Sequence, residues 1–486
     1  MREWVKFERF PLALRAVVLT AALFGVIFLT PTGFWLPISW VVVGGVLILF
    51  WISRVAQRGS RSVLVVGALL GLTLRAVGAW LVVDDVIRYS DTGLYWYLGT
   101  RLADVWTSPG ILDVDLVKVL GTSTTYGYYV WTALHVLLLR DQILTSLSNS
   151  LIGTATGVLT YLLARRVWDE RVAVITAWLV WLSSAFIIID AHSLRDSLAT
   201  FTILATVYGT QRLTERFEVQ GIVWFVLGFV GVVLMRTYLA FLLVPVGLAS
   251  LLVMARGRRL PLLIGFTLGG AVAGALLATS DAFRILAKLS EGNAVTDMIR
   301  AAHFGLVNTE LSSSALAGVK LRTIQDMILF IPVGIVRILF APLPWLPIRM
   351  DVMFIPDVIV RYAIMPLFFV GFWEAIRWHR QRTLLIALVL VAGMVLYSLI
   401  ELGGGVRHNL QFFPYHYLFA AIGWTVAHRH PVLVWTSYGL VTLAVCTVGF
   451  TLMFSLLLFP IIFLVLVVWL CLYMTLQVRF QGSSSA

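Results

Sequence analysis

Charged side chains are scarce in this sequence. Asp, Glu, Lys and Arg make up only 12% of its 486 residues, with 24 acidic residues against 36 basic ones. Soluble globular proteins carry about 25% charged residues. Because 60% of the residues are hydrophobic and the mean hydropathy is +0.95, no soluble domain of this length could bury the apolar surface. The shortage of charge therefore excludes a cytosolic enzyme and a disordered chain, and it indicates an all-α polytopic membrane protein.

Cysteine is almost absent as well. Cys446 and Cys471 both lie inside apolar segments, which excludes the disulfide framework of a small secreted scaffold. The basic N-terminal stretch is followed by an apolar run without the small-residue cleavage site of a signal peptide. We therefore expect this run to be a retained first helix.

The sequence is instead rich in long apolar runs. A membrane-spanning helix needs about 20 mostly apolar residues, and the sequence predicts about fourteen transmembrane helices. Their approximate ranges are 12–29, 35–52, 63–83, 143–164, 172–189, 197–213, 221–235, 237–254, 260–279, 357–376, 384–400, 410–427, 431–448 and 451–473.

The arginines give these helices a direction. If the N-terminus is cytoplasmic, the cytoplasmic loops hold most of the basic residues, and the short outer connections hold only Arg195, Arg236 and Arg407. The positive-inside rule favours this arrangement, with both termini cytoplasmic in the cytoplasmic membrane. The net charge of +12 is then explained by topology, and no nucleic-acid partner is predicted.

Two long segments, 84–142 and 280–356, interrupt the spans and are predicted to be extracytoplasmic loops. The aromatic run 126–139 is too short to span and is predicted to be an interfacial helix, with a short buried helix as the alternative. The proline-rich apolar run from Ile328 is predicted to be re-entrant or interfacial. The chain is thus divided into two N-terminal helices (1–62), a central module (63–260) and a C-terminal membrane region (261–486) with a Gly-rich outer turn at 401–409.

Candidate carboxylates open the first outer loop. Asp84 and Asp85 follow the third span, and Asp91 and Tyr95 share one face if the segment is helical. Carboxylates near the end of a span could act as a general base or as metal ligands facing a lipid-borne substrate. The alternative is that Asp84 and Asp85 only end the helix in water.

A second group of polar residues occupies the next outer turn, and it contains Asp190, His192, Arg195 and Asp196. This turn would approach the first loop if its helices pack beside those of the loop. A histidine with two aspartates could bind a divalent metal ion, but the spacing matches no dedicated ligand motif. In the alternative interpretation Asp196 caps the following helix and Arg195 pairs with it.

Positive charge is predicted on the same face. Arg236, Arg407 and His408 could cradle a phosphate beside the Gly-rich turn, because the guanidinium fork matches phosphate oxygens. Contact with lipid headgroups is the alternative. Arg75, Arg337 and Arg361 lie within apolar stretches, where an unpaired charge is costly, so each is expected to have an acidic or phosphate partner.

The order of these features resembles the GT-C superfamily of integral-membrane glycosyltransferases, above all its bacterial mannosyl- and aminoarabinosyltransferase-like members. The resemblance covers roughly 63–260: a span, Asp91 and Tyr95 in a large outer loop, an interfacial helix, a span ending Tyr161-Leu162-Leu163-Ala164-Arg165-Arg166, a further span and an acidic turn. It implies that Asp91, with Asp84 and Asp85 as competitors, acts at the acceptor. It further implies that Asp196 or Asp190 is the second acid, and that Arg236 or Arg407 holds the carrier phosphate.

The predicted function is transfer of a sugar from a polyprenyl-phosphate carrier to a lipid, glycan or protein acceptor outside, as in cell-envelope or exopolysaccharide assembly. His192, Arg195 and His408 are further candidates for substrate contact. A divalent metal ion is the cofactor that the resemblance leaves open. The alternatives are an O-antigen-type polymerase or ligase, which Arg407 and His408 favour, and a transporter or flippase of the lipid-linked sugar. Transporters tend to place charge at the bilayer midplane, whereas the carboxylates here gather at one interface.

Overall fold

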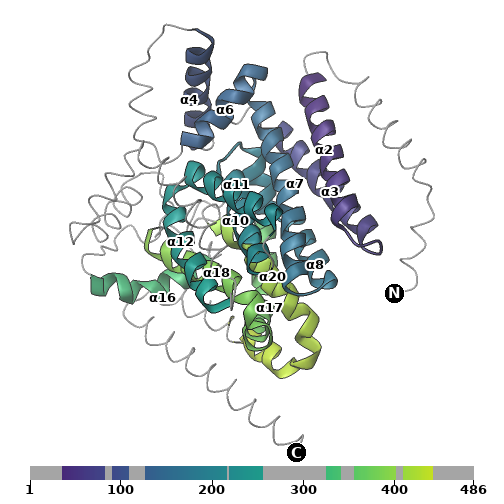
Figure 1. Cartoon of the computed structure of the whole chain (residues 1–486), viewed down its shortest axis with the longest axis vertical. Coiled ribbons are helices and arrows are strands. Elements are labelled where there is room, and N and C mark those ends of the chain that lie inside the picture. The colour runs from purple at the N-terminus through teal and green to yellow at the C-terminus, as the bar shows by residue number, and fades with distance from the viewer. Residues whose placement is uncertain are drawn as a thin grey trace, which may run out of the picture. The chain divides into compact units, whose positions relative to one another are not determined.

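The computed structural model describes residues 35–82, 90–108, 126–215, 218–254, 324–340, 355–400, 409–439 and 441 (Figure 1). These residues form α-helices joined by short turns and 3-10 segments. The chain divides into two compact units, with the division inside one long helix between Leu204 and Ala205. We describe each unit by itself.

Unit 1 contains the helices up to that division. They are α2 (Trp35–Val55), α3 (Arg61–Val82), α4 (Ser90–Thr107), α6 (Tyr126–Leu138), α7 (Gln142–Val167), α8 (Glu170–Leu182), α9 (Ser184–Ala191) and the first half of α10 (Asp196–Glu215). Aspartates begin two of them, as the Asp141 carboxylate accepts a hydrogen bond from Ile143 N (2.9 Å) and that of Asp169 accepts one from Val172 N (2.8 Å). Such caps satisfy amide groups that a helix start leaves without partners.

Helix α7 is the centre of unit 1. It packs against α2, α3, α8 and α9, and its residues are almost all buried although many are Ser, Thr or Asn. Several of these hydroxyls donate to the carbonyl one turn earlier, as Thr154 Oγ1 does to Ser150 O (2.8 Å) and Thr160 Oγ1 to Thr156 O (2.8 Å). A polar helix can therefore be enclosed with its side chains satisfied.

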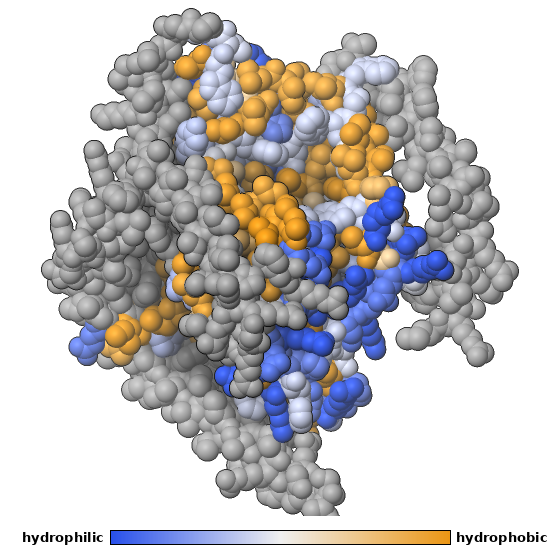
Figure 2. All heavy atoms as spheres, viewed as in Figure 1, coloured by the Kyte–Doolittle hydropathy of each residue, from blue (hydrophilic) through white to orange (hydrophobic). Residues whose placement is uncertain are grey.

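The two ends of unit 1 differ in character. Where α2 meets α3 and α7 meets α8, Arg165 Nη1 donates to Val55 O (2.6 Å), and the Glu170 carboxylate accepts from Tyr161 (2.8 Å) and Ser60. Figure 2 shows hydrophilic residues gathered at the α2–α3 joint and hydrophobic ones above it on the visible face. Arg165, one of the residues predicted to be cytoplasmic, thus lies at this end of unit 1, and the α9–α10 turn lies at the other end of the same helices.

A break interrupts the predicted span 172–189. Helices α8 and α9 meet at Ser183 with a bend of 49°, and Ser183 Oγ accepts from Phe186 N (3.4 Å) at the start of α9. The expectation of one continuous helix is therefore corrected. No proline or glycine lies at the break, so no helix-breaking residue in the sequence indicated it.

The segment predicted to be the first outer loop contributes α4 and α6, which pack against each other. The predicted helix 126–139 is found as α6, and Leu134, Leu137 and Leu138 are exposed along it. Trp40 Nε1 donates to Ser148 Oγ (2.8 Å), which also contacts His135 Nε2 (2.6 Å), so α6 is fastened to α2 and α7.

Unit 2 contains the second half of α10 and the helices after it. They are α11 (Val219–Met235), α12 (Thr237–Met254), α16 (Ile324–Phe340), α17 (Ile355–Trp378), α18 (Arg380–Ile400), the 3-10 turn η5 (Leu410–Phe412), α20 (Phe413–Val426) and η6 (Ala427–Arg429). The closest pair is α17 with α20. A Cβ atom at Gly371 would overlap Phe419 O, and one at Gly423 would overlap Leu367 O.

Five described helices are long and apolar enough to cross a membrane: Trp35–Val55, Arg61–Val82, Gln142–Val167, Pro356–Trp378 and Arg380–Ser398. Counting the bent pair α8 and α9 as one span makes six. The chain is an integral membrane protein of helical fold. The total of fourteen spans stays a prediction, because the runs 12–29, 260–279 and 451–473 lie outside the described residues.

Candidate functional site

The α9–α10 turn is held by side chains of the first outer loop and of α7. Three consecutive carbonyls of the turn each accept a hydrogen bond from a different helix. The pairs are Thr92 Oγ1 (α4) with His192 O at 2.9 Å, Tyr128 Oη (α6) with Ser193 O at 2.5 Å, and Asn149 Nδ2 (α7) with Leu194 O at 2.9 Å. The predicted approach of the acidic turn to the first outer loop is therefore confirmed.

Backbone strain lies at the middle of this turn. Ser193 has a φ of 52°, in the left-handed region where non-glycine residues are uncommon. Its hydroxyl contacts that of Ser146, and its carbonyl is held by Tyr128. Such strain persists only where surrounding contacts over-determine the conformation, and it concentrates at functional sites. The turn is thus a preformed structure.

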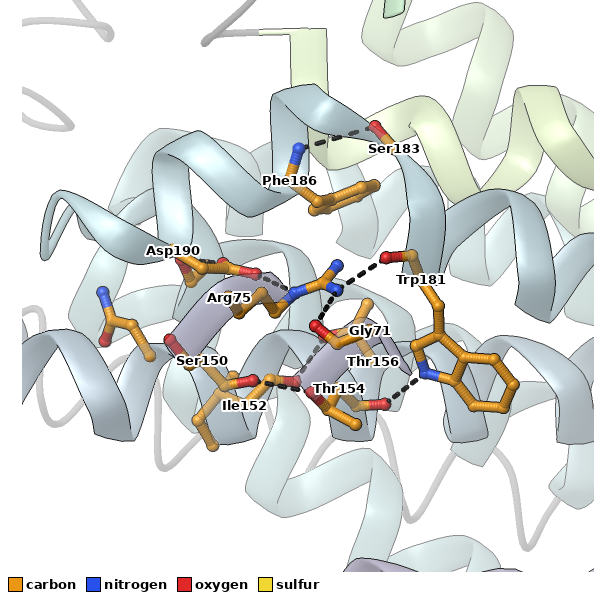
Figure 3. Close-up of polar contacts among 12 residues, drawn as sticks. Gly71, Arg75, Ser150, Ile152, Thr154, Thr156, Trp181, Ser183, Phe186 and Asp190 are labelled. Carbon is orange, nitrogen blue, oxygen red and sulfur yellow. Dashed lines mark hydrogen bonds and ion pairs between the residues drawn. The ribbon is translucent and has the colours of Figure 1, made fainter. Parts of the chain in front are cut away.

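Asp190 lies directly before the turn and is fully buried. Its Oδ2 accepts from Arg75 Nε at 2.7 Å (Figure 3). Its Oδ1 accepts from Ser197 Oγ at the start of α10. Arg75 was expected to need an acidic or phosphate partner, and this expectation is confirmed. Asp190 is occupied by this structural pair, which leaves Asp196 as the turn's candidate for chemistry.

Arg75 also closes the end of α8. Its Nη1 donates to Gly71 O (3.0 Å) and Trp181 O (2.7 Å), and its Nη2 donates to Val180 O (3.0 Å). Figure 3 shows the guanidinium between the Asp190 carboxylate and the Trp181 carbonyl. The last carbonyls of a helix have no partner inside it, so Arg75 satisfies the groups that the break at Ser183 leaves open.

Glycines on α7 make room for this arrangement. A Cβ atom at Gly153 would overlap the Asp190 carboxylate, and one at Gly157 would overlap the Trp181 indole. The indole Nε1 donates to Thr154 O at 2.9 Å. The ion pair and the broken helix therefore fit against the backbone of α7.

Asp91 and Tyr95 occupy the first two turns of α4. Asp91 is half-buried, and Tyr95 is buried against the rings of Tyr128 (4.9 Å between centroids) and Tyr129 (5.8 Å). The Arg195 guanidinium lies over the Tyr95 ring, 6.0 Å from its centroid. The structure thus brings Arg195 of the acidic turn to the helix that carries Asp91.

Arg195 is the only residue of the segment 191–200 that is not buried. None of the described residues accepts a hydrogen bond from its Nε. The expected Arg195–Asp196 pair is not among the ion pairs of the described residues, and the Arg195 guanidinium contacts the Tyr95 ring instead. The turn therefore presents one cation beside α4.

Asp196 and His192 are buried within the turn. Asp196 lies in the first turn of α10, and His192 Nδ1 contacts Ile188 O at 2.8 Å. Within the described part of the chain, no three His, Cys, Asp or Glu side chains come close enough to hold a metal ion. The set of Asp190, His192 and Asp196 does not form such a site there.

His135 belongs to a network that the sequence did not suggest. Its Nδ1 lies 2.7 Å from Trp131 O, and its Nε2 lies 2.6 Å from Ser148 Oγ. The tautomer that fits has the proton on Nδ1, because a carbonyl can only accept. Burial lowers the pKa of His135, and the hydrogen bond to the Trp131 carbonyl opposes this only in part. Burial therefore favours the neutral imidazole in the folded protein.

Arg236 lies in the interior of unit 2 and not at a surface. The residue is 1% exposed, and its Nη1 donates to Tyr397 Oη (3.1 Å). With the Gln411 amide oriented to face it, Gln411 oxygen accepts from Arg236 Nε at 2.9 Å. Tyr397 precedes the segment 401–409 in the sequence and Gln411 follows it, so Arg236 contacts one residue before and one residue after that segment. Its contact with a carrier phosphate stays a prediction.

Arg361 confirms the second expectation about buried arginines. Its Nε lies 3.0 Å from Asp357 Oδ2, one turn earlier on α17, and Tyr417 Oη donates to Asp357 Oδ1 (3.1 Å). The spacing of four residues between Asp357 and Arg361 is the signal that could have identified this partner.

Four predicted site residues lie outside the described residues, namely Asp84, Asp85, Arg407 and His408. The side chain of Arg337 lies outside them as well. Their predicted roles stay predictions.

Comparison with known proteins gives partial likeness to solved structures. No protein-family model matches the sequence, and no curated protein does. A solved structure of the archaeal oligosaccharyltransferase AglB from Archaeoglobus fulgidus, in complex with an inhibitory peptide and a dolichol-phosphate, is 15% identical with a TM-score of 0.46. The similarity covers 80% of this chain and 55% of that one, so this chain spans about half the length of AglB.

Proposed function

We propose that this protein is an integral-membrane glycosyltransferase that moves a sugar from a polyprenyl-phosphate carrier to an acceptor at the extracytoplasmic face. The observation that carries the proposal is the contact of the α9–α10 turn with α4 and α6. It places Asp196 and Arg195 on a strained, preformed turn against the helix of Asp91 and Tyr95. The same order of features gave the resemblance to the GT-C superfamily.

In the proposed reaction Asp91 is the general base. The acceptor hydroxyl attacks the anomeric carbon and gives its proton to the Asp91 carboxylate, while the bond from that carbon to the phosphate oxygen breaks. The polyprenyl phosphate leaves with the bonding electrons. Asp91 is half-buried at the start of α4, where a carboxylate can meet a substrate from outside, whereas the Asp190 carboxylate is engaged in its ion pair with Arg75. Asp196 is proposed as the second acid of the site, and Asp84 and Asp85 remain competitors of Asp91.

Arg195 is proposed to contact the departing phosphate. The leaving group gains negative charge as the glycosidic bond breaks, and a cation fixed beforehand in a partly dry site stabilises that charge. Arg195 meets this requirement because it is anchored on a rigid turn and leans on the Tyr95 ring. His192, Arg236, Arg407 and His408 are secondary candidates for this contact.

The donor is proposed to be lipid-linked for a topological reason. Nucleotide sugars are made in the cytoplasm, whereas every candidate carboxylate and arginine maps to the predicted outer side. A carrier lipid delivers an activated sugar across the bilayer and holds it at interfacial depth. The exposed leucines of α6 provide an apolar surface there.

The donor class is tested by incubating the purified protein with a panel of polyprenyl-phosphate sugars and following transfer or hydrolysis by mass spectrometry. We expect release of polyprenyl phosphate from at least one member. Turnover of a nucleotide sugar in the absence of any carrier lipid would contradict the proposal. If no member of the panel is turned over, the alternative functions, a polymerase or ligase or a transporter, would be favoured.

The base is tested by Asp91→Asn, with Asp104→Asn as the matched control near the other end of the same helix. Asp104 pairs with Arg140 at the surface. Loss of a positioned base should lower the transfer rate by roughly 10²–10⁴-fold, while the control should retain the wild-type rate. Both variants should elute as the wild type does in size-exclusion chromatography. Full activity of Asp91→Asn would remove this assignment and transfer it to Asp85.

A further inference from the structure

The residues that follow α17 and α20 lie together at one end of unit 2. The two helices pack side by side (Figure 1). Tyr417 Oη, in the second turn of α20, donates to Asp357 Oδ1 at the start of α17 (3.1 Å). Beyond the other end of α20, His430 Nε2 lies 3.5 Å from the carboxylate of Glu374, near the end of α17. Helices α17 and α20 therefore run in the same direction, and the residues that follow them share one surface.

This surface, which we call the basic end, is rich in arginine and histidine. It comprises Arg377, His379, Arg380, Arg382, His428, Arg429 and His430. All of them are exposed except His430, which is partly buried. Only His379 separates α17 from α18, and each of these helices contains a segment long and apolar enough to cross a membrane. The basic end therefore lies at a membrane surface.

The four arginines of the basic end have no carboxylate partner among the described residues. None of them forms an ion pair there, and the nearby carboxylate of Glu374 is buried beside His430. The joint between α10 and α11 differs, because Arg212 pairs with Glu218. The positive-inside rule accounts for the sign of these charges but not for the lack of counter-charges. Four cations gathered at two adjoining turns raise the local potential and attract anions.

Exposed tryptophans indicate the depth of the basic end in the membrane. Trp378, Trp424 and Trp435 have exposed fractions of 63%, 61% and 75%, and each lies within about two helical turns of Arg377 or Arg429 in the sequence. The Arg377 guanidinium lies 4.9 Å from the centre of the Trp378 ring. Tryptophan is enriched where a membrane meets water, with its ring at the level of the headgroups. The neighbouring arginines thus stand beside lipid phosphates, which favours a membrane lipid over a soluble polyanion.

We propose that the basic end binds the phosphate groups of anionic phospholipids in the leaflet that adjoins it. The planar guanidinium matches two phosphate oxygens at once, and the tryptophan rings lie against the glycerol and the first part of the acyl chains. The sequence predicts this end to be cytoplasmic, and the cytoplasmic leaflet is the one with a negative surface potential. None of these residues belongs to the site proposed above, so the inference is independent of the proposed function.

The test follows two photoactivatable lipids in nanodiscs that contain the full-length protein. One is phosphatidylglycerol with a diazirine near the start of an acyl chain, and the other is phosphatidylcholine with the same chains and the same label. Each is added in trace amount to zwitterionic nanodiscs. We expect phosphatidylglycerol to label peptides 376–382 and 427–435 roughly tenfold more than phosphatidylcholine, because each arginine at a membrane surface favours an anionic lipid several-fold. Equal labelling of these peptides by the two lipids would overturn the proposal.

Two double variants determine whether the preference belongs to the basic end. Arg380→Gln with Arg382→Gln removes two exposed charges there and should lower the preference for phosphatidylglycerol at these peptides by about threefold or more. Arg58→Gln with Arg61→Gln removes two exposed charges at the α2–α3 joint, on the same predicted side, and should leave that preference unchanged. Equal losses in the two variants would show an effect of total charge alone and would overturn the proposal. The wild-type comparison of the two lipids needs no variant to fold.

A soluble competitor distinguishes a lipid from a phosphate compound in solution. Excess glycerol phosphate should not reduce labelling by phosphatidylglycerol, because it has no acyl chains to hold it at headgroup depth. Sodium chloride at the same ionic strength is the control for screening. Loss of labelling with glycerol phosphate but not with sodium chloride would show that the basic end takes phosphate from solution, and it would contradict the assignment to a lipid.

Discussion

Arg75 and Asp190 form an ion pair in which both side chains are fully buried. Charges are expensive to bury, and removal of one partner leaves the other without compensation. The network is nevertheless well satisfied, because the remaining guanidinium N–H groups donate to carbonyls of α3 and α8. The network therefore stabilises the fold only while both Arg75 and Asp190 are present.

Asp190→Asn should destabilise the protein by about 3–5 kcal/mol, since it leaves the Arg75 charge buried without its counter-ion. The matched change is Asp104→Asn in the exposed pair with Arg140, which should cost at most about 1 kcal/mol. Unfolding in detergent, followed by circular dichroism against denaturant, measures both. Equal effects at the buried and the exposed pair would contradict this account.

His135 predicts a dependence of stability on pH. Burial lowers its pKa in the folded protein below the ordinary value of about 6.5, so the unfolded chain binds the proton first as the pH falls. The contribution of His135 is thus fully present above about pH 6.5 and is lost progressively as the pH falls towards the lowered value. Melting temperatures of wild type and His135→Gln between pH 7.5 and 5 should converge on acidification. A constant difference would show that His135 does not titrate in this way.

At the scale of helices, the contact between α7 and the α8–α9 pair depends on glycine. Gly153→Ala would drive a methyl group into the Asp190 carboxylate and should destabilise by roughly 1–3 kcal/mol through overpacking. Gly78→Ala on α3 is the control, because its Cβ would lie 3.5 Å from the nearest atom, Ala191 Cβ. Alanine is favoured over glycine in a helix, so this change should be neutral or stabilising. The same unfolding measurement compares the stabilities of the two variants. A Gly153→Ala protein as stable as the wild type would contradict this account, because α7 would then have to move to make room for the methyl group.

The helices of unit 1 could largely be predicted from apolar runs, and α6 from its length and aromatic content. Arginines in apolar stretches predicted buried partners, and Asp190 and Asp357 are those partners. The break at Ser183 could not be predicted, because the group that satisfies its carbonyls comes from α3, about a hundred residues earlier. The strain at Ser193 was equally invisible, since serine carries no preference for positive φ and the contacts that impose it come from three other helices.

The position of Arg236 was predicted wrongly from the local sequence. A single arginine between two apolar runs indicates a loop at the membrane surface, and this reasoning placed its guanidinium there. Its partners Tyr397 and Gln411 lie more than 150 residues later in the sequence. Contacts between residues so far apart in the sequence decide whether Arg236 is buried. The local sequence around Arg236 cannot reveal them.

At the scale of the whole molecule, the separation of basic and acidic ends predicts sidedness. Thr107, at the end of α4, and Gln57, between α2 and α3, are both exposed. In a background without Cys446 and Cys471, a membrane-impermeant maleimide should label Thr107→Cys in intact cells but Gln57→Cys only after permeabilisation. Labelling of Gln57→Cys in intact cells would invert the topology and remove the candidate site from the outer face.

Helix α7 has a consequence for the way the protein is made. It is the least apolar of the five candidate spans and the most completely enclosed by other helices. Its hydroxyl and amide groups are satisfied in part by partners such as Trp40 and Trp131, which belong to α2 and α6. A segment of this kind partitions weakly into lipid by itself. We expect α2 and α3 of the nascent chain to stay beside the insertion channel until α7 emerges. These helices would then enter the bilayer together.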